Sequence, residues 1–520
     1  MDDTRSSPSA LNMDVLRNVL ALSDGRTIAR MMQLSRELYH EGPKHLLRLP
    51  VRLRRESSIS SFVAFMLAED ARRVRFLTNL HISTGLLSRA EAGPFEDFVF
   101  RFAPQMNIIQ LDIERAEEFF ESSPGLSSAF SLLTTVKHLK MDEIGRRASI
   151  FLEQLRSQLV SADLTMIPRP IRHDEDDEDS DEDEDEDDPS IRNPILQLRN
   201  SQDTLKSLDV TFGDTDCDVG ELFEQRYPHV KRLNLIANEL PYTMHYARAY
   251  PNVTTLTIAC AERELAELGT KMDDYVDQRH VNKLEQMSHG SWKSLKEVHG
   301  TLIDHFLLAA LCPVEQLHIR GPFMDTRMFR SVLLTTTPAY VNFDAFDVDL
   351  FYEADFKRLM RGHFVQPIRC FEITLMLGGI LEPKDVSMPR ALDILLEGIS
   401  QMPSLRSFGL TLMCFSLVPE LEDYLLGVTG SGSVPLTRAE KYLQDIDLNG
   451  LVGRIREAVP TLESVVVTLF GHRTRANTSA TFGADVPWPK GAVEAIPLER
   501  APTITRISKS MVHTIANMVL

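Results

Sequence analysis

A short apolar pattern recurs along most of the chain and most constrains how it can fold. Each copy has apolar residues at relative positions zero, three and five, as in Val230, Leu233 and Leu235. The last two positions fall on the same face of a short strand, because successive strand side chains point to opposite sides. The clear copies are Leu77/Leu80/Ile82, Ile108/Leu111/Ile113, Val136/Leu139/Met141, Leu205/Leu208/Val210, Val230/Leu233/Leu235, Val253/Leu256/Ile258, Val314/Leu317/Ile319, Ile368/Phe371/Ile373, Leu405/Phe408/Leu410 and Leu462/Val465/Val467.

The distance between copies indicates a repeat array. The step is 31 residues from Leu80 to Leu111, 25 from Leu208 to Leu233 and 23 from Leu233 to Leu256. A repeat of about 20–29 residues with this spacing resembles the leucine-rich repeat. Each such unit leaves apolar faces bare until its neighbour stacks on it, so the resemblance implies a continuous curved βα coil. A generic α/β protein whose strands happen to carry the pattern is the alternative.

The segments between the copies complete this expectation. Residues 150–155 and 391–399 are amphipathic and predict outer helices. Three long steps are interpreted as insertions: the acidic tract, residues 262–290 and residues 415–459. Weaker copies of the pattern stand at Leu295/Val298 and Val341/Phe343.

The N-terminal segment has a helical pattern instead. Leu11, Val15, Val19 and Leu22 repeat at helical spacing, and Leu16 and Leu20 form a second row. Asp24-Gly25 interrupts the pattern, and a second helix is expected around Ile28, Met31, Met32 and Leu34. A helix that is apolar on two rows has more surface to bury than its own short hairpin can cover. This surface must therefore contact the rest of the chain or a partner.

This segment resembles the F-box, the adaptor-binding motif of ubiquitin-ligase receptors. The family pattern Leu-Pro-x-Glu-Val-Leu-x-x-Ile-Leu is matched in register, a Leu-Ser-Arg follows where the family has Val-x-Arg, and residues 38–48 resemble fungal members. Asn12, Ser23 and Leu38 stand where the family has proline, leucine and tryptophan. The resemblance implies contact with a Skp-type adaptor of a cullin ligase. The implied adaptor-binding residues are Leu11, Asn12, Val15, Leu16, Val19, Leu20, Ile28, Leu34 and Arg36.

Together these patterns predict an α/β fold: an N-terminal all-α F-box-like helical hairpin followed by a curved leucine-rich-repeat βα solenoid of the ribonuclease-inhibitor type. A first strand is expected in residues 44–53 and a helix from Ser60. The expected ranges are 8–47 for the F-box-like domain, 48–471 for the solenoid, 172–192 for a disordered acidic insertion, 472–502 for a mobile tail and 503–520 for a capping strand and helix.

Charge is concentrated in one segment. The net charge is −19, and residues 174–188 hold fourteen acidic side chains interrupted by Ser180. Self-repulsion and the lack of apolar residues predict disorder there. The segment is either a solvated loop or a docking tract for a basic partner, in which Ser180 is a candidate phosphorylation site. Nucleic-acid binding is disfavoured, because phosphate contacts need a basic face.

The cysteines and the hydropathy indicate a compartment. Five cysteines are scattered without a C-x-x-C pair, which argues against a disulfide framework or a zinc module. The acidic N-terminus lacks a secretory apolar region, and no segment has the length of a membrane span. We therefore expect a soluble cytoplasmic or nuclear protein that acts as a monomer within a hetero-complex.

The sequence nominates no catalytic, metal or cofactor site. It contains no H-E-x-x-H, G-x-S-x-G, Walker or dinucleotide-binding motif, and His40, His45, His81 and His138 stand apart from one another. We therefore expect a protein without catalytic activity of its own. The F-box resemblance together with the repeats implies a substrate receptor, with the adaptor on the N-terminal helices and the substrate on the solenoid. One alternative is a repeat scaffold unconnected to ubiquitin, whose terminal helices only cap the array. Another is a chaperone-like binder of basic proteins through the acidic tract.

Overall fold

The fold is described from a computed structural model of the whole chain. It describes residues 13–168, 189–213, 223–237, 242–260, 272–321, 325–347, 358–377, 387–414, 436, 438–472 and 474–483. The chain divides into two compact units, Met1–Asp344 and Ala345–Leu520. Both units are mixed α/β, and in each the paired strands follow chain order. This arrangement is compatible with a solenoid of βα repeats.

The chain begins with three helices, α1 (Met13–Leu22), α2 (Gly25–Met31) and α3 (Arg36–Leu46). Asp24 caps α2 by accepting a hydrogen bond from the Thr27 backbone N–H at 2.7 Å, and Ser35 caps α3 through the Leu38 N–H at 3.2 Å. The helices share a small apolar core. Its buried members are Leu20, Ile28, Met31, Met32 and Leu38.

The N-terminal region differs in detail from the sequence expectation. The break at Asp24 lies between α1 and α2 as predicted, but a third helix follows where residues 44–53 were expected to form a strand. Only Val51–Leu53 is extended, as β1. The predicted first strand is confirmed only in these three residues. Its expected start was wrong because Leu46 belongs to α3 and Leu47 closes that helix, with the Leu47 N–H donating to the Pro43 carbonyl at 3.0 Å.

The first unit contains a parallel sheet in which each strand pairs with the next one along the chain. The sequence contains ten clear copies of the apolar pattern, each of which predicted a strand. The copies within this unit all coincide with strands. The weaker copies at Leu295 and Val341 also lie in strands, β9 and β11. The strands are β1 (Val51–Leu53), β2 (Asn79–Ile82), β3 (Gln110–Ile113), β4 (His138–Ile144), β5 (Ser161–Met166), β6 (Ser207–Gly213), β7 (Arg232–Ala237), β8 (Thr255–Cys260), β9 (Leu295–Thr301), β10 (Val314–Arg320) and β11 (Tyr340–Asp347).

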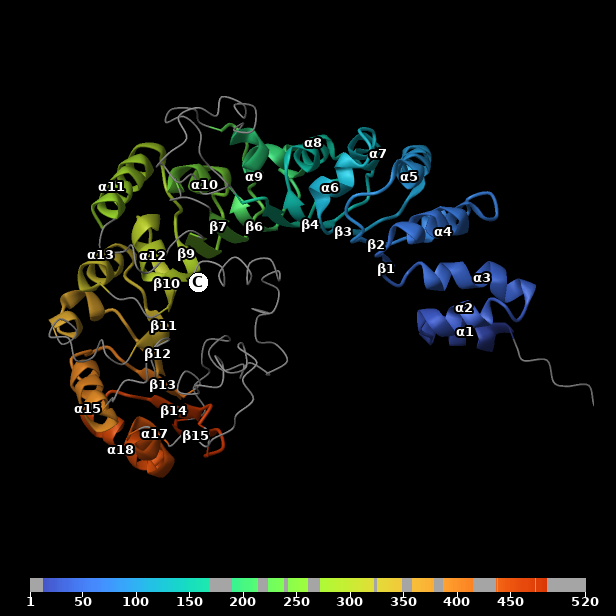
Figure 1. The fold of residues 1–520 in the computed structure, drawn as a ribbon. Helices are drawn as coiled ribbons and strands as arrows, with labels where there is room; N and C mark the ends of the chain where they lie inside the picture. The colour runs from blue at the N-terminus through green and yellow to red at the C-terminus, as the bar shows by residue number, and fades with distance from the viewer. Residues whose placement is uncertain are drawn as a thin grey trace, which may run out of the picture. The chain divides into compact units, whose positions relative to one another are not determined.

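Helices cover one face of this sheet (Figure 1). Residues 150–155 were expected to be helical, and residues 150–154 lie in α8 while Leu155 caps its end. The helix expected from Ser60 begins earlier, at Glu56. The helices are α4 (Glu56–Leu67), α5 (Arg89–Phe102), α6 (Ala116–Glu121), α7 (Leu126–Ser131), α8 (Arg146–Gln154), α9 (Pro194–Gln197), α10 (Thr243–Ala249), α11 (Met272–His289), α12 (Leu302–Leu308) and α13 (Thr326–Thr336).

The central residue of each apolar pattern forms a ladder beneath these helices. Leu80 pairs in register with Leu111, and Leu111 with Leu139. The ladder members from β2 to β11 are at most 3% exposed, so the repeated spacing creates one continuous core. They are Leu80, Leu111, Leu139, Ala162, Leu208, Leu233, Leu256, Val298, Leu317 and Val341.

Phenylalanines fill the layer between the first helices. Phe95 on α5 is fully buried and contacts the rings of Phe62, Phe98, Phe119 and Phe130. Ring centroids in this cluster are 5.0–6.5 Å apart, most of them edge-to-face. This geometry adds specific contact energy to the area that the rings bury.

The stretch 262–290, interpreted as an insertion, contains an outer helix of the array. Residues 272–289 form α11, which packs between α10 and α12. Its buried Asn282 donates to the Leu307 carbonyl at 2.8 Å, and Gln286 donates to the Leu308 carbonyl at 3.0 Å. These amides satisfy carbonyls at the end of α12 that have no partner within that helix.

The second unit continues the same pattern with β12 (Cys370–Met376), β13 (Ser407–Met413) and β14 (Ser464–Phe470), which are parallel. Its helices are α15 (Met388–Ile399), as expected from residues 391–399, α17 (Arg438–Asp445) and α18 (Leu448–Ala458). The last two fall in the stretch 415–459 that was interpreted as an insertion.

The range expected to be a mobile tail contains a further strand. β15 (Thr478–Phe482) pairs with β14 in the antiparallel direction. Pro189–Arg192, at the end of the expected disordered insertion, forms a 3-10 turn. Residues 174–188 with Ser180, and the expected capping segment 503–520, lie outside the described residues. No helix of the described residues is long and apolar enough to cross a membrane.

Candidate functional site

One face of α1 exposes apolar side chains. Val15 is 47% exposed, Val19 42% and Leu22 89%. Their spacing of four and three residues places them on the same side of the helix. Leu34, just after α2, is 76% exposed. The core fixes this arrangement, because Leu20 on the other side of α1 is fully buried.

The structure separates the residues predicted to bind an adaptor into groups. Val15, Val19, Leu34 and Arg36 are exposed, and Leu16 is half-buried against the core. Leu20 and Ile28 are at most 1% exposed, so they support the helices from within and cannot be surface contacts. Leu11 and Asn12 lie outside the described residues. Leu22 was not among the predicted contacts, although it continues the helical spacing of Val15 and Val19.

The face of the first unit's sheet that no helix of the described residues covers is polar throughout its central rows. One row of register partners is Arg52, His81, Asp112, Lys140, Asp163, Asp209, Asn234, Thr257, His299, His318 and Asn342. The row beside it is Asn79, Gln110, His138, Ser161, Ser207, Arg232, Thr255, Glu297, Gln316 and Tyr340. Alternation along each strand sends these side chains away from the leucine ladder. We call this surface the open face.

Charged pairs join neighbouring strands at the N-terminal end of the open face. His81 lies between two carboxylates, with Nδ1 3.2 Å from Asp112 and Nε2 3.3 Å from Glu114. Lys140 Nζ lies 3.4 Å from Asp163. Because the pairs bridge adjacent strands, they add polar cross-strand contacts to the ladder beneath.

Burial shifts the ionisation of several groups here. It raises the pKa of Asp112, Asp142 and Asp209 above the ordinary aspartate value, although His81, Lys140 and other partners oppose the shift. Burial alone would lower the pKa of Lys140, but the carboxylates around it raise the value. The ionisable side chains of the open face are therefore partly removed from water. Where they are charged, this strengthens their interaction with a ligand of opposite charge.

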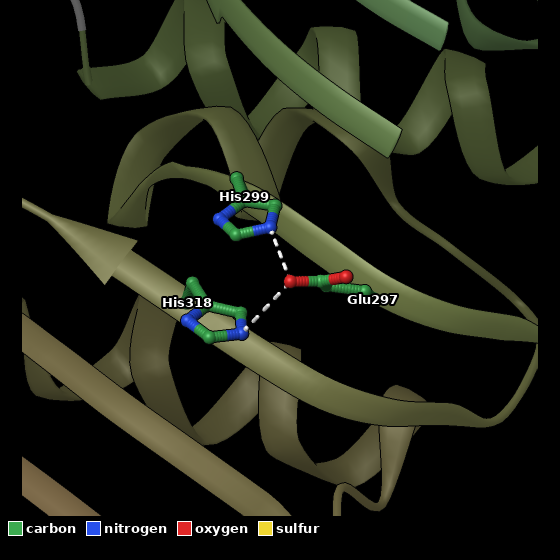
Figure 2. Close-up of side chains that lie close together, drawn as sticks. All are labelled: Glu297, His299 and His318. Atoms are coloured by element: carbon green, nitrogen blue, oxygen red, sulfur yellow. Dashed lines mark hydrogen bonds and ion pairs between the residues drawn. The ribbon is translucent and has the colours of Figure 1, made fainter. Parts of the chain in front are cut away.

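Further along the open face, three side chains converge on one point (Figure 2). His299 on β9 and His318 on β10 are register partners, and their rings stack with centroids 4.2 Å apart and planes at 14°. Glu297 Oε1 lies 2.9 Å from His299 Nε2 and 3.5 Å from His318 Nε2. All three ligand atoms lie within 4.8 Å of one another. We call this group the histidine–glutamate cluster.

Both imidazoles of the cluster favour the neutral form. Burial lowers the pKa of His299, against the attraction of Glu297. Burial, followed by the influence of His299, His305 and Arg320, lowers the pKa of His318 to about 3. His318 Nε2 is buried and makes no hydrogen bond within the described residues. A neutral ring with a free nitrogen lone pair is the form that binds metal ions.

The sequence reasoning missed this cluster and treated the histidines as isolated. A signal was present: His299 and His318 each directly follow the central residue of a repeat, so they occupy matching positions on neighbouring strands. The four histidines thought to stand apart have partners. His40 lies 2.7 Å from Glu69, His45 3.9 Å from Glu41, His81 near two carboxylates, and His138 2.8 Å from Ser161.

Comparison with known proteins does not identify a family for this chain. No protein-family model matches the chain, and no curated protein matches it significantly.

Proposed function

We propose that this chain is the substrate-recognition subunit of a Skp–cullin–F-box ubiquitin ligase. The N-terminal helices would bind the Skp-type adaptor, and a leucine-rich-repeat solenoid would present its open face to a substrate protein. The observation that carries the proposal is the exposed apolar face of α1, formed by Val15, Val19 and Leu22, at the position of the F-box-like sequence.

The packing of α1 supports this role. Leu20 anchors the helix to α2 and α3, so the helix cannot turn Val15 and Val19 inward without exposing that anchor. Leu22 has the largest exposed fraction of the three residues on this face, and Leu34, just after α2, is also largely exposed. A cluster of exposed apolar side chains on a small helical unit is typical of a protein-binding surface. Of the residues predicted to bind the adaptor, we therefore retain the exposed ones, and we add Leu22.

The open face suits a binding role rather than catalysis by this chain. Its rows of half-buried polar and charged side chains extend across many strands and can contact a broad protein surface. In such a complex the chain would act by proximity, because it holds substrate lysines at high effective concentration beside a bound conjugating enzyme. It would contribute no catalytic side chain.

The test is adaptor binding by the full-length chain with charges placed on the exposed face. We expect micromolar or tighter binding that Val19→Asp combined with Leu22→Asp abolishes, because two carboxylates would be buried against apolar surface. Phe100→Asp is the matched control, since Phe100 is 62% exposed on α5. Leu20→Asp is unsuitable, because it would disrupt the core instead of the surface.

A properly folded wild-type chain that shows no adaptor binding would reject the receptor proposal. Equal loss of binding in the Phe100→Asp control would also count against it, because the effect would not belong to α1. The open face would then support the alternative, a repeat scaffold that binds proteins without a link to ubiquitin. Deleting residues 174–188 separates the receptor from the chaperone-like alternative. The chaperone-like alternative predicts lost binding of basic proteins, whereas the receptor predicts an intact adaptor complex.

A further inference from the structure

We propose that Glu297, His299 and His318 form a binding site for a divalent transition-metal ion of the zinc class. The site is independent of the proposed adaptor surface, because it lies on β9 and β10 of the open face. The carboxylate oxygen and two imidazole nitrogens would supply three protein ligands, and water or a donor from a bound partner would complete a tetrahedron.

The spacing of the ligand atoms fits such an ion. Zinc bonds to nitrogen and oxygen of about 2.0–2.1 Å place tetrahedral ligands about 3.3–3.4 Å apart. Glu297 Oε1 lies 2.9 Å from His299 Nε2 and 3.5 Å from His318 Nε2, close to this separation on both sides. All three ligand atoms lie within 4.8 Å of one another. Because the two rings are stacked, they would have to tilt for both in-plane nitrogen lone pairs to point at one ion.

The backbone holds these ligands in place before any ion binds. Residues 297 and 299 alternate onto the same face of β9, and the ladder fixes His318 directly beside His299. The ring of Tyr340 on β11 lies 5.2 Å from that of His318 and supports its orientation. His318 Nε2 is buried and makes no hydrogen bond within the described chain, since Glu297 Oε1 is 3.5 Å away, so an ion between them would satisfy this polar atom.

Partial access to solvent leaves room for an additional ligand. The side chains of Glu297, His299 and His318 are 31%, 18% and 13% exposed. One neighbouring charge opposes the cation: Arg320, whose interaction with both imidazoles already favours their neutral form. Arg320 therefore sets an upper limit on affinity, and its removal should tighten binding.

The experiment titrates the metal-stripped full-length chain with Co²⁺ and then Zn²⁺, in excess Mg²⁺ to occupy the acidic tract. We expect one equivalent of Co²⁺ to give the visible absorption of a tetrahedral site and Zn²⁺ to displace it. Loss of an outer-shell partner of a metal ligand typically weakens binding about 10–100-fold, and His299→Ala and His318→Ala, which remove a ligand itself, should each weaken Zn²⁺ binding at least as much. Arg320→Gln should strengthen it.

His138→Ala is the matched control, because His138 lies on the same face but bonds only to Ser161 among the interactions described here. Binding unchanged in this control and lost in the ligand variants supports the site. Should His318→Ala fail to fold, Glu297→Gln provides the second variant and should weaken binding without removing a ring. Equal Zn²⁺ affinity in a folded His299→Ala/His318→Ala double variant, or no tetrahedral Co²⁺ spectrum in the wild type, would overturn the proposal.

Discussion

The N-terminal helices and the repeats treat apolar residues in opposite ways. The helices bury a core of five residues and expose Val15, Val19, Leu22 and Leu34. The repeats bury their leucine ladder at 3% exposure or less and present polar rows on the open face. Burial by stacking explains the repeats, since each unit covers its neighbour. The helices have no such neighbour for α1 within the described chain, which is why we assign that surface to a partner.

The largest effect should come from the repeat core. Phe95→Ala removes a fully buried ring that contacts four others, and we expect the free energy of unfolding to fall by about 3–5 kcal/mol. Phe100→Ala, on the exposed side of the same helix, should change it by about 0.5 kcal/mol or less. Urea denaturation of both variants measures the difference. Similar losses would show that the exposed side of α5 contributes as much to stability as the buried side. The proposed difference between buried and exposed residues would then be wrong.

An intermediate effect is expected at the junction between the two regions. Arg73 is 2% exposed, its guanidinium lies 4.9 Å from the Tyr39 ring and 4.4 Å from the Phe65 ring, and it donates to the Phe65 carbonyl. Arg73→Met should lower the free energy of unfolding by about 2–4 kcal/mol, because it leaves Glu69 and that carbonyl without this partner.

Hydrogen exchange would locate the effect of Arg73→Met. Amides of α3 and α4 should lose protection more than those of β6–β8, because the side chain joins these two helices. The neighbouring Arg72→Met is the control, since Arg72 is exposed. An even loss of protection along the whole first unit would instead mean that the helices and repeats unfold as one.

The smallest effect should appear on the open face and depend on pH. Burial raises the pKa of Asp142 in the folded state, so its ionised form is less favourable there than in the unfolded chain. The contribution of Asp142 to the free energy of unfolding therefore falls as the pH rises from its pKa in the unfolded chain through its higher pKa in the folded state. Asp142→Asn should be slightly more stable than the wild type at pH 7, and the two should converge at acidic pH.

Thermal unfolding across pH 3 to 7, a range of about four units around the ordinary aspartate pKa, would measure this dependence. Thr165→Val removes a hydroxyl 3.3 Å from Asp142 that favours the charged form, which raises the folded-state pKa of Asp142 further. The fall in stability should therefore begin at the same pH but extend to higher pH and become larger. A wild-type curve that rises with pH through this window while Asp142→Asn stays flat would contradict the assignment.

The apolar spacing was sufficient to predict most strands, and its failures have local causes. β5 was missed because Ala162 takes the central position, where a leucine was sought. β9 had only a weak copy because Gly300 takes the last apolar position. A Cβ at Gly300 would lie 2.7 Å from the Ile258 carbonyl oxygen, so the close approach of β8 requires glycine there.

The remaining features depend on contacts that no apolar pattern reports. The helix α11 buries Asn282 and Gln286, whose amides bond to backbone carbonyls, so hydropathy treats its core side as surface. The histidine–glutamate cluster requires knowing that β9 and β10 are neighbours in register. For the adaptor surface, helical spacing identified candidates, but only packing separated Val19 outside from Leu20 inside.

The reversed direction of β15 has a consequence for the length of the molecule. A parallel array can in principle be extended without limit, because its last strand presents the same edge as every strand before it. Here β14 gives that edge to β15, which runs antiparallel from Leu469↔Thr478 to Val465↔Phe482. A further parallel repeat therefore cannot pair with β14 directly. Any strand added beyond β15 would meet an edge of reversed direction, so the order of the parallel repeats changes at this one short strand.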